Sequence, residues 1–145
     1  MIATASSVPW AVGRACGDRW AAPLDFGLSF QDGKRLLGSH KTWRGLAAGI
    51  AASGMVGWLL GLGPLVGTGI GAAALAGDAV SSAIKRRLSH RPGTEIWGLD
   101  QIPESLLPLL IFREPLGLSL GQVFAVVVVF AILDLLATPL RHRRP

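Results

Sequence analysis

Charged residues are scarce in this chain of 145 residues, at 16% of the composition against about 25% in an average soluble domain. Half of the residues are hydrophobic, and the mean hydropathy is +0.48. These values exclude an intrinsically disordered chain, which needs low hydrophobicity and high charge. They also argue against a soluble globular protein and favour one that is embedded in a lipid bilayer.

The sequence also lacks the patterns of several common classes of active site. Its one cysteine, Cys16, can form neither an internal disulfide nor a cysteine-based metal site. The 3 histidines show no His-x-x-x-His spacing, so a zinc site is not expected. Neither a Gly-x-Ser-x-Gly nucleophile motif nor a Walker P-loop occurs, which argues against serine-hydrolase chemistry and P-loop nucleotide binding.

Two long runs of the chain contain no charged residue, at 45–77 and 115–133. A helix rises about 1.5 Å per residue, so the first run is too long for one crossing of a hydrocarbon core of about 30 Å. Glycines and a proline at 61–64 divide it. We therefore predict membrane-spanning helices at 43–60, 65–84 and 119–140, and a short or broken helix at 96–112, where prolines interrupt an apolar segment.

The first 22 residues are less informative. Residues 8–12 are apolar but too few to cross a bilayer, and the segment lacks the basic start and long apolar core of a signal peptide. Two interpretations remain open: a re-entrant or surface segment, or a longer first helix inside which the given sequence starts. We favour the second.

Basic residues gather between the predicted helices. Lysine and arginine outnumber acidic residues by 14 to 9, giving a formal net charge of +5. Most of them lie in 14–44, 85–91 and the tail at 141–144. Basic loops between apolar helices follow the positive-inside tendency, so we expect these segments on the cytoplasmic side of the cell membrane and no nucleic acid partner.

Glycines spaced four residues apart predict close packing between the helices. The pairs are Gly45 with Gly49, Gly57 with Gly61, Gly63 with Gly67, and Gly67 with Gly71. We predict an all-α integral membrane protein in which residues 1–145 form a single transmembrane domain. This multi-pass domain is a compact bundle of about four to five transmembrane helices with cytoplasmic basic loops, and its oligomeric state is left open.

Asp78 lies near the end of an otherwise uncharged helix, where an ionisable side chain needs a partner or a polar cavity. Ser82 and Lys85 follow at helical spacing on the same face, which leads into the basic cluster 85–87. A magnesium–phosphate site and an intramembrane Asp–Arg pair fit this pattern equally well. Asp100 offers a second carboxylate, and two carboxylates can hold Mg²⁺ where they converge.

Three other acidic residues are alternative candidates for a metal ligand. They are Glu95, Glu104 and Asp134, for which we expect solvation at the membrane interface or a local ion pair.

The segment 32–45 combines glycines, cations and hydroxyl groups directly before a helix, a pattern that suits phosphates. A basic loop that contacts anionic headgroups is the alternative. Trp43 either anchors at the interface or stacks on a nucleobase.

With these residues placed, several strings resemble the CDP-archaeol synthase family of membrane cytidylyltransferases. In the first block they are PLDFG at 23–27, DGKRLLG at 32–38 and the specific string KTWRG at 41–45. In the second block they are GD at 77–78, Ser82, KRR at 85–87, PG at 92–93 and LDQ at 99–101, which also resemble the phosphatidate cytidylyltransferase signature. The resemblance covers about residues 23–101.

The resemblance implies an all-helical enzyme that transfers CMP from CTP to the phosphate of a membrane lipid similar to archaetidic or phosphatidic acid. Pyrophosphate leaves, and Mg²⁺ is the expected cofactor. By the same resemblance, Asp78 and Asp100 bind the metal and form the catalytic centre with Lys85. The residues implied to contact CTP and phosphates are Lys34, Arg35, Lys41, Thr42, Trp43, Arg44, Ser82, Arg86 and Arg87.

One departure from the family pattern supports a second hypothesis. Pro103 stands where the family's Asp-Gln-x-Asp run has its second acid, and Glu104 is shifted by one position. A non-catalytic homologue that binds anionic lipid or nucleotide would explain this change. A small transporter component is a third hypothesis, suggested by Asp78 within a helix and by the prolines at 103–108. Whether the lipid carries ester-linked acyl chains or ether-linked isoprenoids is left open.

Overall fold

The structure is a computed structural model that describes residues 1–91, 94 and 96–142, with side chains as far as residue 136. It contains five helices: α1 (Ile2–Cys16), α2 (Trp43–Leu59), α3 (Pro64–Arg87), α4 (Gln101–Ile111) and α5 (Leu120–His142). No β-strand occurs among the described residues, where pairing is limited to two isolated bridges in loops. The all-helical prediction is confirmed.

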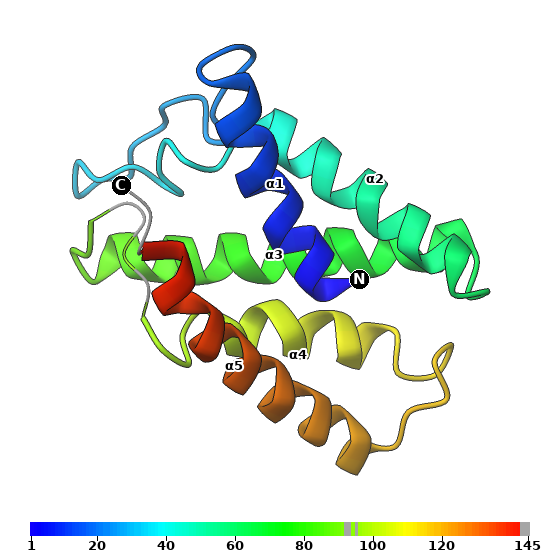
Figure 1. The fold of residues 1–145 in the computed structure, drawn as a ribbon. Coiled ribbons are helices and arrows are strands. Elements are labelled where there is room, and N and C mark those ends of the chain that lie inside the picture. Colours follow the sequence, from blue (N-terminus) through cyan, green and yellow to red (C-terminus); the bar gives the residue numbers. More distant parts are fainter. Residues whose placement is uncertain (92–93, 95, 143–145) are drawn as a thin grey trace.

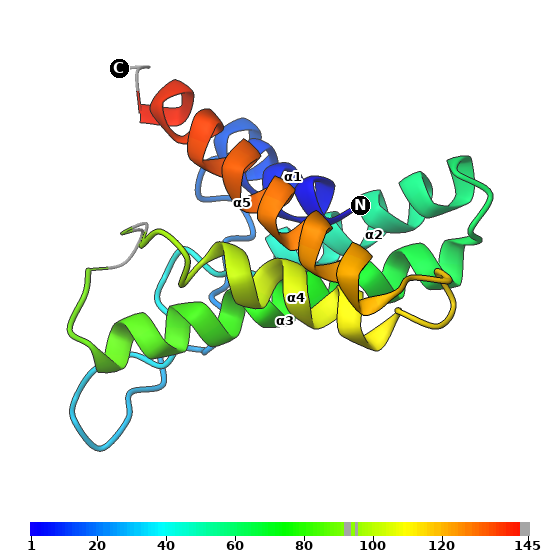
Figure 2. The ribbon, with the colours of Figure 1, turned by 90° about the horizontal axis from the view of Figure 1, so that it is seen from below.

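Helix α3 lies at the centre of the molecule. Figure 1 shows α2 along one side of α3 and α4 along the other, with α1 crossing α2 and α3. Helix α5 packs on α4, as the rotated view in Figure 2 also shows. The C-terminal end of α3 lies beside the loop that precedes α2.

Helices at the predicted positions 43–60 and 65–84 are confirmed as α2 and α3, and α3 continues through the basic cluster 85–87. That α2 spans a membrane stays a prediction. Thr42 caps α2 by accepting a hydrogen bond from the backbone N–H of Gly45 at 3.2 Å. At the turn between the two helices, Pro64 occupies the first helical turn of α3. The chain reverses there as the sequence predicts.

Helix α4 is short and unbroken. Pro103 lies in its first turn, where a backbone N–H has no partner within the helix, so the proline costs no hydrogen bond. Pro108 lies further along, and its carbonyl accepts the N–H of Phe112 at 2.9 Å. The segment predicted as a short or broken helix is thus a single helix of 11 residues.

Glycines bring α2 against its neighbours. A Cβ atom on Gly49 would lie 2.8 Å from a carbonyl oxygen of α1, and one on Gly57 would lie 2.6 Å from the Cα atom of Gly67. Gly61 and Gly63 behave differently, because both have positive φ and nothing within 4 Å of an added Cβ. The prediction that these two glycines pack helices together is wrong, since they form the turn of the hairpin instead.

The first segment forms α1, a helix of 15 residues with Pro9 inside it. Ala5 is fully buried against α2, and Pro9 lies where a Cβ on Gly45 would approach it to 3.1 Å. Helix α1 is therefore a packed element of the bundle.

The apolar surface of the bundle is extensive. By length and composition, α3 is the one helix among the described residues that could cross a membrane, and α4 and the part Leu120–Leu136 of α5 are shorter apolar helices. The buried hydrophobic residues are few: Ala5, Ile70, Ala73, Ala74, Leu109, Val123 and Val127. Large side chains such as Trp58, Leu65 and Phe124 are exposed instead. An apolar exterior around small, closely packed residues is typical of proteins in lipid.

The loop between α1 and α2 is built around Asp25, which is 4% exposed. Its carboxylate accepts a hydrogen bond from Arg35 at 2.9 Å and three backbone N–H bonds, from Gly27, Leu37 and Gly38. Burial raises the pKa of Asp25, but the three N–H donors and Arg35 outweigh it and hold that pKa below its usual value. A charged carboxylate therefore fixes the shape of this loop.

Candidate active site

A cavity of about 760 Å³ opens between α1, α3, the start of α4 and the loop before α2. Four carboxylates line it, from Asp78, Asp100, Glu104 and Asp134, and three cations line it, from Arg14, Lys41 and Lys85. Since only 16% of the chain is charged, this cavity holds an unusual share of its ionisable groups.

Asp78 projects from α3 and forms an ion pair with Lys41 of the preceding loop. The loop backbone fixes the position of Lys41, because its carbonyl accepts the N–H of Leu24 at 2.7 Å. The side chains of Lys41 and Asp78 are 18% and 25% exposed. Both therefore remain accessible from the cavity.

Asp100 forms a second ion pair at the start of α4. Its Oδ1 atom lies 2.7 Å from Nζ of Lys85, and its Oδ2 atom accepts the N–H of Ile96 at 3.0 Å. Lys85 is 6% exposed and also donates to the carbonyl of Thr94 at 2.8 Å. The nearly buried Lys85 is thus held by a carboxylate and a carbonyl.

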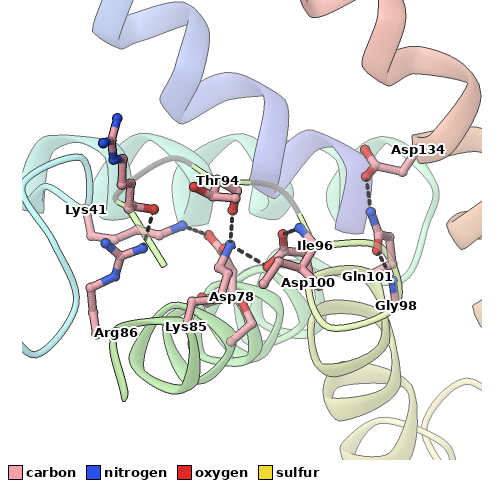
Figure 3. A network of polar contacts seen from close by, with 12 residues as sticks. Lys41, Asp78, Lys85, Arg86, Thr94, Ile96, Gly98, Asp100, Gln101 and Asp134 are labelled. Carbon is pink, nitrogen blue, oxygen red and sulfur yellow. Dashed lines mark hydrogen bonds and ion pairs between the residues drawn. The ribbon is translucent and has the colours of Figure 1, made fainter. Parts of the chain in front are cut away.

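The two ion pairs lie side by side across α3. Asp78 and Lys85 are seven residues apart, two helical turns along one face, as the sequence predicts. Figure 3 shows Lys41, Asp78, Lys85 and Asp100 following one another as alternating charges. The sequence could not establish that Asp100 reaches the site of Asp78, and the structure places both carboxylates in one cavity.

A glycine makes this convergence sterically possible. A Cβ atom on Gly77 would lie 2.1 Å from the carbonyl oxygen of Pro103, so only a residue without a side chain lets α4 lie so close to α3. Gly77 precedes Asp78, and Pro103 follows Asp100 by three residues. The backbone of Pro103, the departure from the family pattern, is therefore the point at which α4 lies against α3.

Further polar contacts connect α4 to α1 and α5. Gln101 donates from Nε2 to Asp134 at 2.8 Å and accepts the N–H of Gly98 at 2.8 Å (Figure 3). Ser6 of α1 forms a hydrogen bond with Glu104. Glu104 and Asp134, expected at the interface, thus line the cavity, whereas Glu95 lies outside the described residues, as do Pro92 and Gly93 of the second block.

Sequence reasoning did not single out Arg14, whose guanidinium lies 5.1 Å from the ring centroid of Trp10 and lines the cavity. It also gave no role to Gln101. A signal for Asp134 was present, because an acid inside the apolar run of α5 needs a polar partner. Arg14 carries no such signal, since it follows an apolar segment as many interfacial arginines do.

Five of the predicted site residues line the cavity: Lys41, Thr42, Asp78, Lys85 and Asp100. Others connect the loop to the end of α3 instead. Arg87 donates to Asp32 at 2.8 Å and to the carbonyls of Lys34 and Arg35, and it stacks over Phe30. Lys34 donates to Ser89 at 2.6 Å. Since Arg35 is paired with Asp25, these three cations hold the loop in place.

The remaining predicted residues also have local contacts. Arg44 donates to the carbonyls of Gly17 and Arg19, and Arg86, 5% exposed, donates to the carbonyl of Arg91 at 2.6 Å. Trp43 is 46% exposed, with its ring centroid 5.9 Å from that of Phe26. Ser82 is 1% exposed, and its hydroxyl has no hydrogen-bond partner among the described residues.

His40 lies in the cavity wall next to Lys41. Loss of hydration and the neighbouring cations, Lys41 first, lower the pKa of His40 from 6.5 to about 4, against a smaller opposing effect of Asp78. The imidazole is therefore neutral at pH 7. Within the described residues, no group of three or more histidine, cysteine or acidic side chains is arranged to hold a metal ion by itself.

Comparison with known proteins identifies the family of this chain. Residues 14–142 match a family model described as CarS-like, CDP-archaeol synthase. The CDP-archaeol synthase of Pyrobaculum aerophilum is 33% identical over 133 residues, which cover 86% of this chain and 74% of that protein. That of Pyrococcus furiosus is 35% identical over 131 residues, which cover 83% of this chain and 73% of that protein.

A solved structure has the same fold. It belongs to an intramembrane enzyme for archaeal membrane lipids biosynthesis and superimposes with a TM-score of 0.73 at 30% identity, covering 94% of this chain and 90% of that chain. The family match spans both blocks that carry the sequence resemblance. The resemblance is thereby confirmed, and this chain belongs to the CDP-archaeol synthase family.

Proposed function

We propose that this protein transfers CMP from CTP to the phosphate of a membrane lipid, giving a CDP-lipid and pyrophosphate, and that the charged cavity is its active site. Family membership supports the reaction. One observation supports this location of the active site. Asp78 and Asp100, from separate helical elements, line the same cavity, and each is paired with a lysine.

We propose Mg²⁺ as the cofactor, held by Asp78 and Asp100. Mg²⁺ prefers oxygen ligands and commonly uses one or two carboxylates together with substrate phosphates. Two carboxylates in one cavity fit that donor set. When bound, the ion would neutralise negative charge on the phosphates of CTP.

The lysines would contribute by binding phosphate oxygens. Lys41 and Lys85 each already pair with a carboxylate, and Lys85 also donates to the carbonyl of Thr94. Arg14 has no carboxylate partner in the described part of the chain, so it can bind a lipid phosphate without losing an ion pair. Three cations from different elements would then surround the reacting phosphates.

The reaction requires positioning and charge neutralisation and no covalent enzyme intermediate. An oxygen of the lipid phosphate attacks the α-phosphorus of CTP, a new P–O bond forms, and the bond to the β-phosphate oxygen breaks in line. Cations fixed before the substrate binds stabilise the charge that develops on the phosphates. His40 is neutral at pH 7, so it adds no charge to the site.

We propose that the chain crosses the cell membrane several times with the cavity on the cytoplasmic side, where CTP is available. The long apolar helix α3 and the exposed apolar side chains support the membrane location. The basic segments support the orientation, because the loop before α2 and the end of α3 lie together, linked by Lys34 to Ser89 and by Arg87 to Asp32.

The lipid substrate is most closely indicated by the relatives, which carry the name CDP-archaeol synthase. We propose a lipid phosphate with ether-linked isoprenoid chains. The purified protein in detergent would be given α-labelled CTP, Mg²⁺ and either that lipid or phosphatidic acid.

Labelled CDP-lipid formed faster from the ether lipid, and lost on chelation of Mg²⁺, is the expected result. Preference for phosphatidic acid would overturn the assignment of the lipid. Binding of CTP without any CDP-lipid would overturn catalysis and favour a non-catalytic homologue.

A further inference from the structure

Asp134 places a carboxylate in a strongly apolar helix. The stretch 115–133 before it contains no charged residue, and an acid in such a helix needs a polar partner. The neighbouring side chains of Leu133 and Leu135 are 60% and 48% exposed, whereas Asp134 is half-buried. The side chain of Asp134 therefore points into the bundle, where its Oδ2 atom accepts a hydrogen bond from Nε2 of Gln101 at 2.8 Å.

Gln101 uses both ends of its side-chain amide. Its Nε2 atom donates to Asp134, and its Oε1 atom accepts the N–H of Gly98 at 2.8 Å (Figure 3). Reversing the amide would place its oxygen against a carboxylate and its NH₂ group against an N–H donor. Because Gln101 is 4% exposed, water does not readily replace either bond. Asp134 therefore fixes the orientation of this amide.

The amide of Gln101 in turn holds the turn that carries Asp100. Gly98 lies in that turn with a φ of +81°. Asp100 closes the same turn, since its Oδ2 atom accepts the N–H of Ile96 at 3.0 Å and its own N–H donates to the carbonyl of Ile96 at 3.2 Å. The position of the Asp100 carboxylate therefore depends on the contact between α5 and Gln101.

Apolar packing between α4 and α5 is separate from this contact. The buried cluster between the two helices consists of Leu109 of α4 with Val123 and Val127 of α5. Asp134 lies on the same face of α5, two helical turns beyond Val127. Apolar side chains thus hold one end of α5, and the polar contact acts at the end beside the charged cavity.

We propose that Asp134 is a positioning residue for CMP transfer, which orients Gln101 and, through it, the turn that presents Asp100 to the charged cavity. The inference rests on the proposed function and gives α5 a role in it. Asp134 also lines the cavity, so the alternative is direct contact with the metal ion. The two roles have different requirements, because orienting an amide needs a hydrogen-bond acceptor, whereas binding a cation needs the negative charge.

An exchange of donor and acceptor between the two side chains separates these roles. Gln101→Glu keeps an acceptor for the N–H of Gly98, and a carboxylate is favourable at the start of a helix, yet it would face the carboxylate of Asp134. Adding Asp134→Asn supplies an amide donor and restores the hydrogen bond in the opposite direction. The wild type, both single variants and the double variant would be assayed for CMP transfer with Mg²⁺.

We expect Gln101→Glu to lower kcat about tenfold and the double variant to regain most of that loss. Asp134→Asn alone keeps an acceptor for Gln101, so it should lower kcat by less than about threefold. A double variant no more active than Gln101→Glu would overturn the inference. So would a larger loss in Asp134→Asn than in Gln101→Glu, because that result would mean that Asp134 acts through its charge.

A second comparison does not require Gln101→Glu to fold. Asp134→Leu removes the acceptor in a helix where leucine is favourable, whereas Asp134→Asn keeps it. We expect a loss of kcat of about tenfold in Asp134→Leu alone. An equal loss in the two variants would overturn the inference.

Gln122→Glu is the matched control. Gln122 accepts the N–H of Ser119 at 2.8 Å at the start of α5, in the same arrangement as Gln101 and Gly98, but at an exposed position that does not line the charged cavity. This variant should keep its activity to within about twofold of the wild type. A tenfold loss here too would overturn the inference, because the effect would then not depend on Asp134.

Hydrogen–deuterium exchange gives a readout that needs no turnover. In the ligand-free protein, the peptide that contains residues 96–101 should exchange faster in Gln101→Glu and slower again in the double variant. Unchanged exchange in Gln101→Glu would overturn the inference. This exchange pattern in a protein whose wild type forms no CDP-lipid would overturn the proposed function and leave the contact between Asp134 and the turn standing.

Discussion

At the scale of single residues, the candidate site is an arrangement of charges that satisfy one another. Lys41 pairs with Asp78 and Lys85 with Asp100, in a protein with little charge elsewhere in its helices. Ionised groups away from bulk water are stable only where such partners are present. A phosphate that takes over Lys41 or Lys85 leaves the carboxylate of Asp78 or Asp100 in need of another cation.

His40 makes the stability of the unliganded protein depend on pH. Its pKa is about 4 in the folded state and 6.5 in its unperturbed state. Between these values the unfolded chain takes up a proton that the folded chain does not, so the free energy of unfolding falls as the pH drops from about 6.5 to 4. Thermal unfolding at a series of pH values should show this decline.

His40→Gln removes the titrating group and should flatten the stability profile between those pH values. The decline below pH 4 should remain, because the pKa of Asp25 is lower in the folded state than its ordinary value of 3.8. A profile for His40→Gln that matches the wild type between pH 4 and 6.5 would show that the imidazole is already hydrated in the fold.

Helical spacing in the sequence was enough to predict that Asp78 and Lys85 share a face. It was not enough to separate the cations of the cavity from those of the loop. Arg35 and Arg87 were predicted to bind phosphate. In the structure Arg35 pairs with Asp25 of its own loop, and Arg87 pairs with Asp32, which lies 55 residues away in the chain. Their predicted roles in CTP binding remain untested.

At the scale of helices, Gly77 sets the distance between α3 and α4. Gly77→Ala would place a Cβ atom 2.1 Å from a backbone oxygen of α4, so the helices must separate. We expect a loss of about 1–3 kcal/mol in the free energy of unfolding. The rate of CMP transfer should fall by more than the loss of folded protein explains, because Asp100 moves away from Asp78.

Gly121→Ala is the matched control, since its Cβ would meet nothing closer than the Ser119 hydroxyl at 4.0 Å. That variant should be as stable as the wild type or more stable, by up to about 1 kcal/mol. Denaturation followed by circular dichroism, together with the transfer assay, measures both effects. Equal behaviour of the two alanine variants would contradict the close approach of α3 and α4.

Asp25 holds the loop between α1 and α2 in shape, and its removal should loosen that loop alone. In Asp25→Asn the amide nitrogen meets backbone N–H donors, and Arg35 loses its partner. We expect trypsin to cleave faster after Lys34, Arg35 and Lys41 while the helices stay folded. Mass spectrometry of the fragments identifies the sites.

The control for the loop is Asp18→Asn, which also removes one negative charge but at an exposed position. Its cleavage pattern should equal that of the wild type. Resistance of Asp25→Asn to trypsin at these positions would mean that other contacts, such as that of Arg87 with Asp32, suffice to hold the loop.

The helices themselves were well predicted, because uncharged runs bounded by glycine and proline indicate both their length and the hairpin. The spacing of the glycines in the sequence could not distinguish glycines that pack helices together from glycines that form a turn. Gly57 and Gly67 touch across a helix interface, whereas Gly61 and Gly63 adopt positive φ in the turn. The difference depends on where the helices end, which a repeat of four residues does not encode.

At the scale of the whole molecule, the proposed topology places the turn at Leu62 and the segment after α3 on opposite sides of the membrane. In a Cys16→Ser background, Leu62→Cys should react with an impermeant maleimide on intact cells. Ser89→Cys should react only after permeabilisation, because it lies beside the basic loop. Labelling of Ser89→Cys in intact cells would contradict the cytoplasmic placement of the cavity.

The central claim is that the carboxylates of α3 and α4 form one reaction centre for CMP transfer. The most direct measurement compares CDP-lipid formation by the wild type, Asp78→Asn, Asp100→Asn and the exposed control Asp18→Asn, all in detergent with Mg²⁺ and all checked for folding. We predict that each of the first two substitutions lowers kcat at least about 100-fold and that Asp18→Asn does not. Full activity in either folded variant, Asp78→Asn or Asp100→Asn, would contradict the claim.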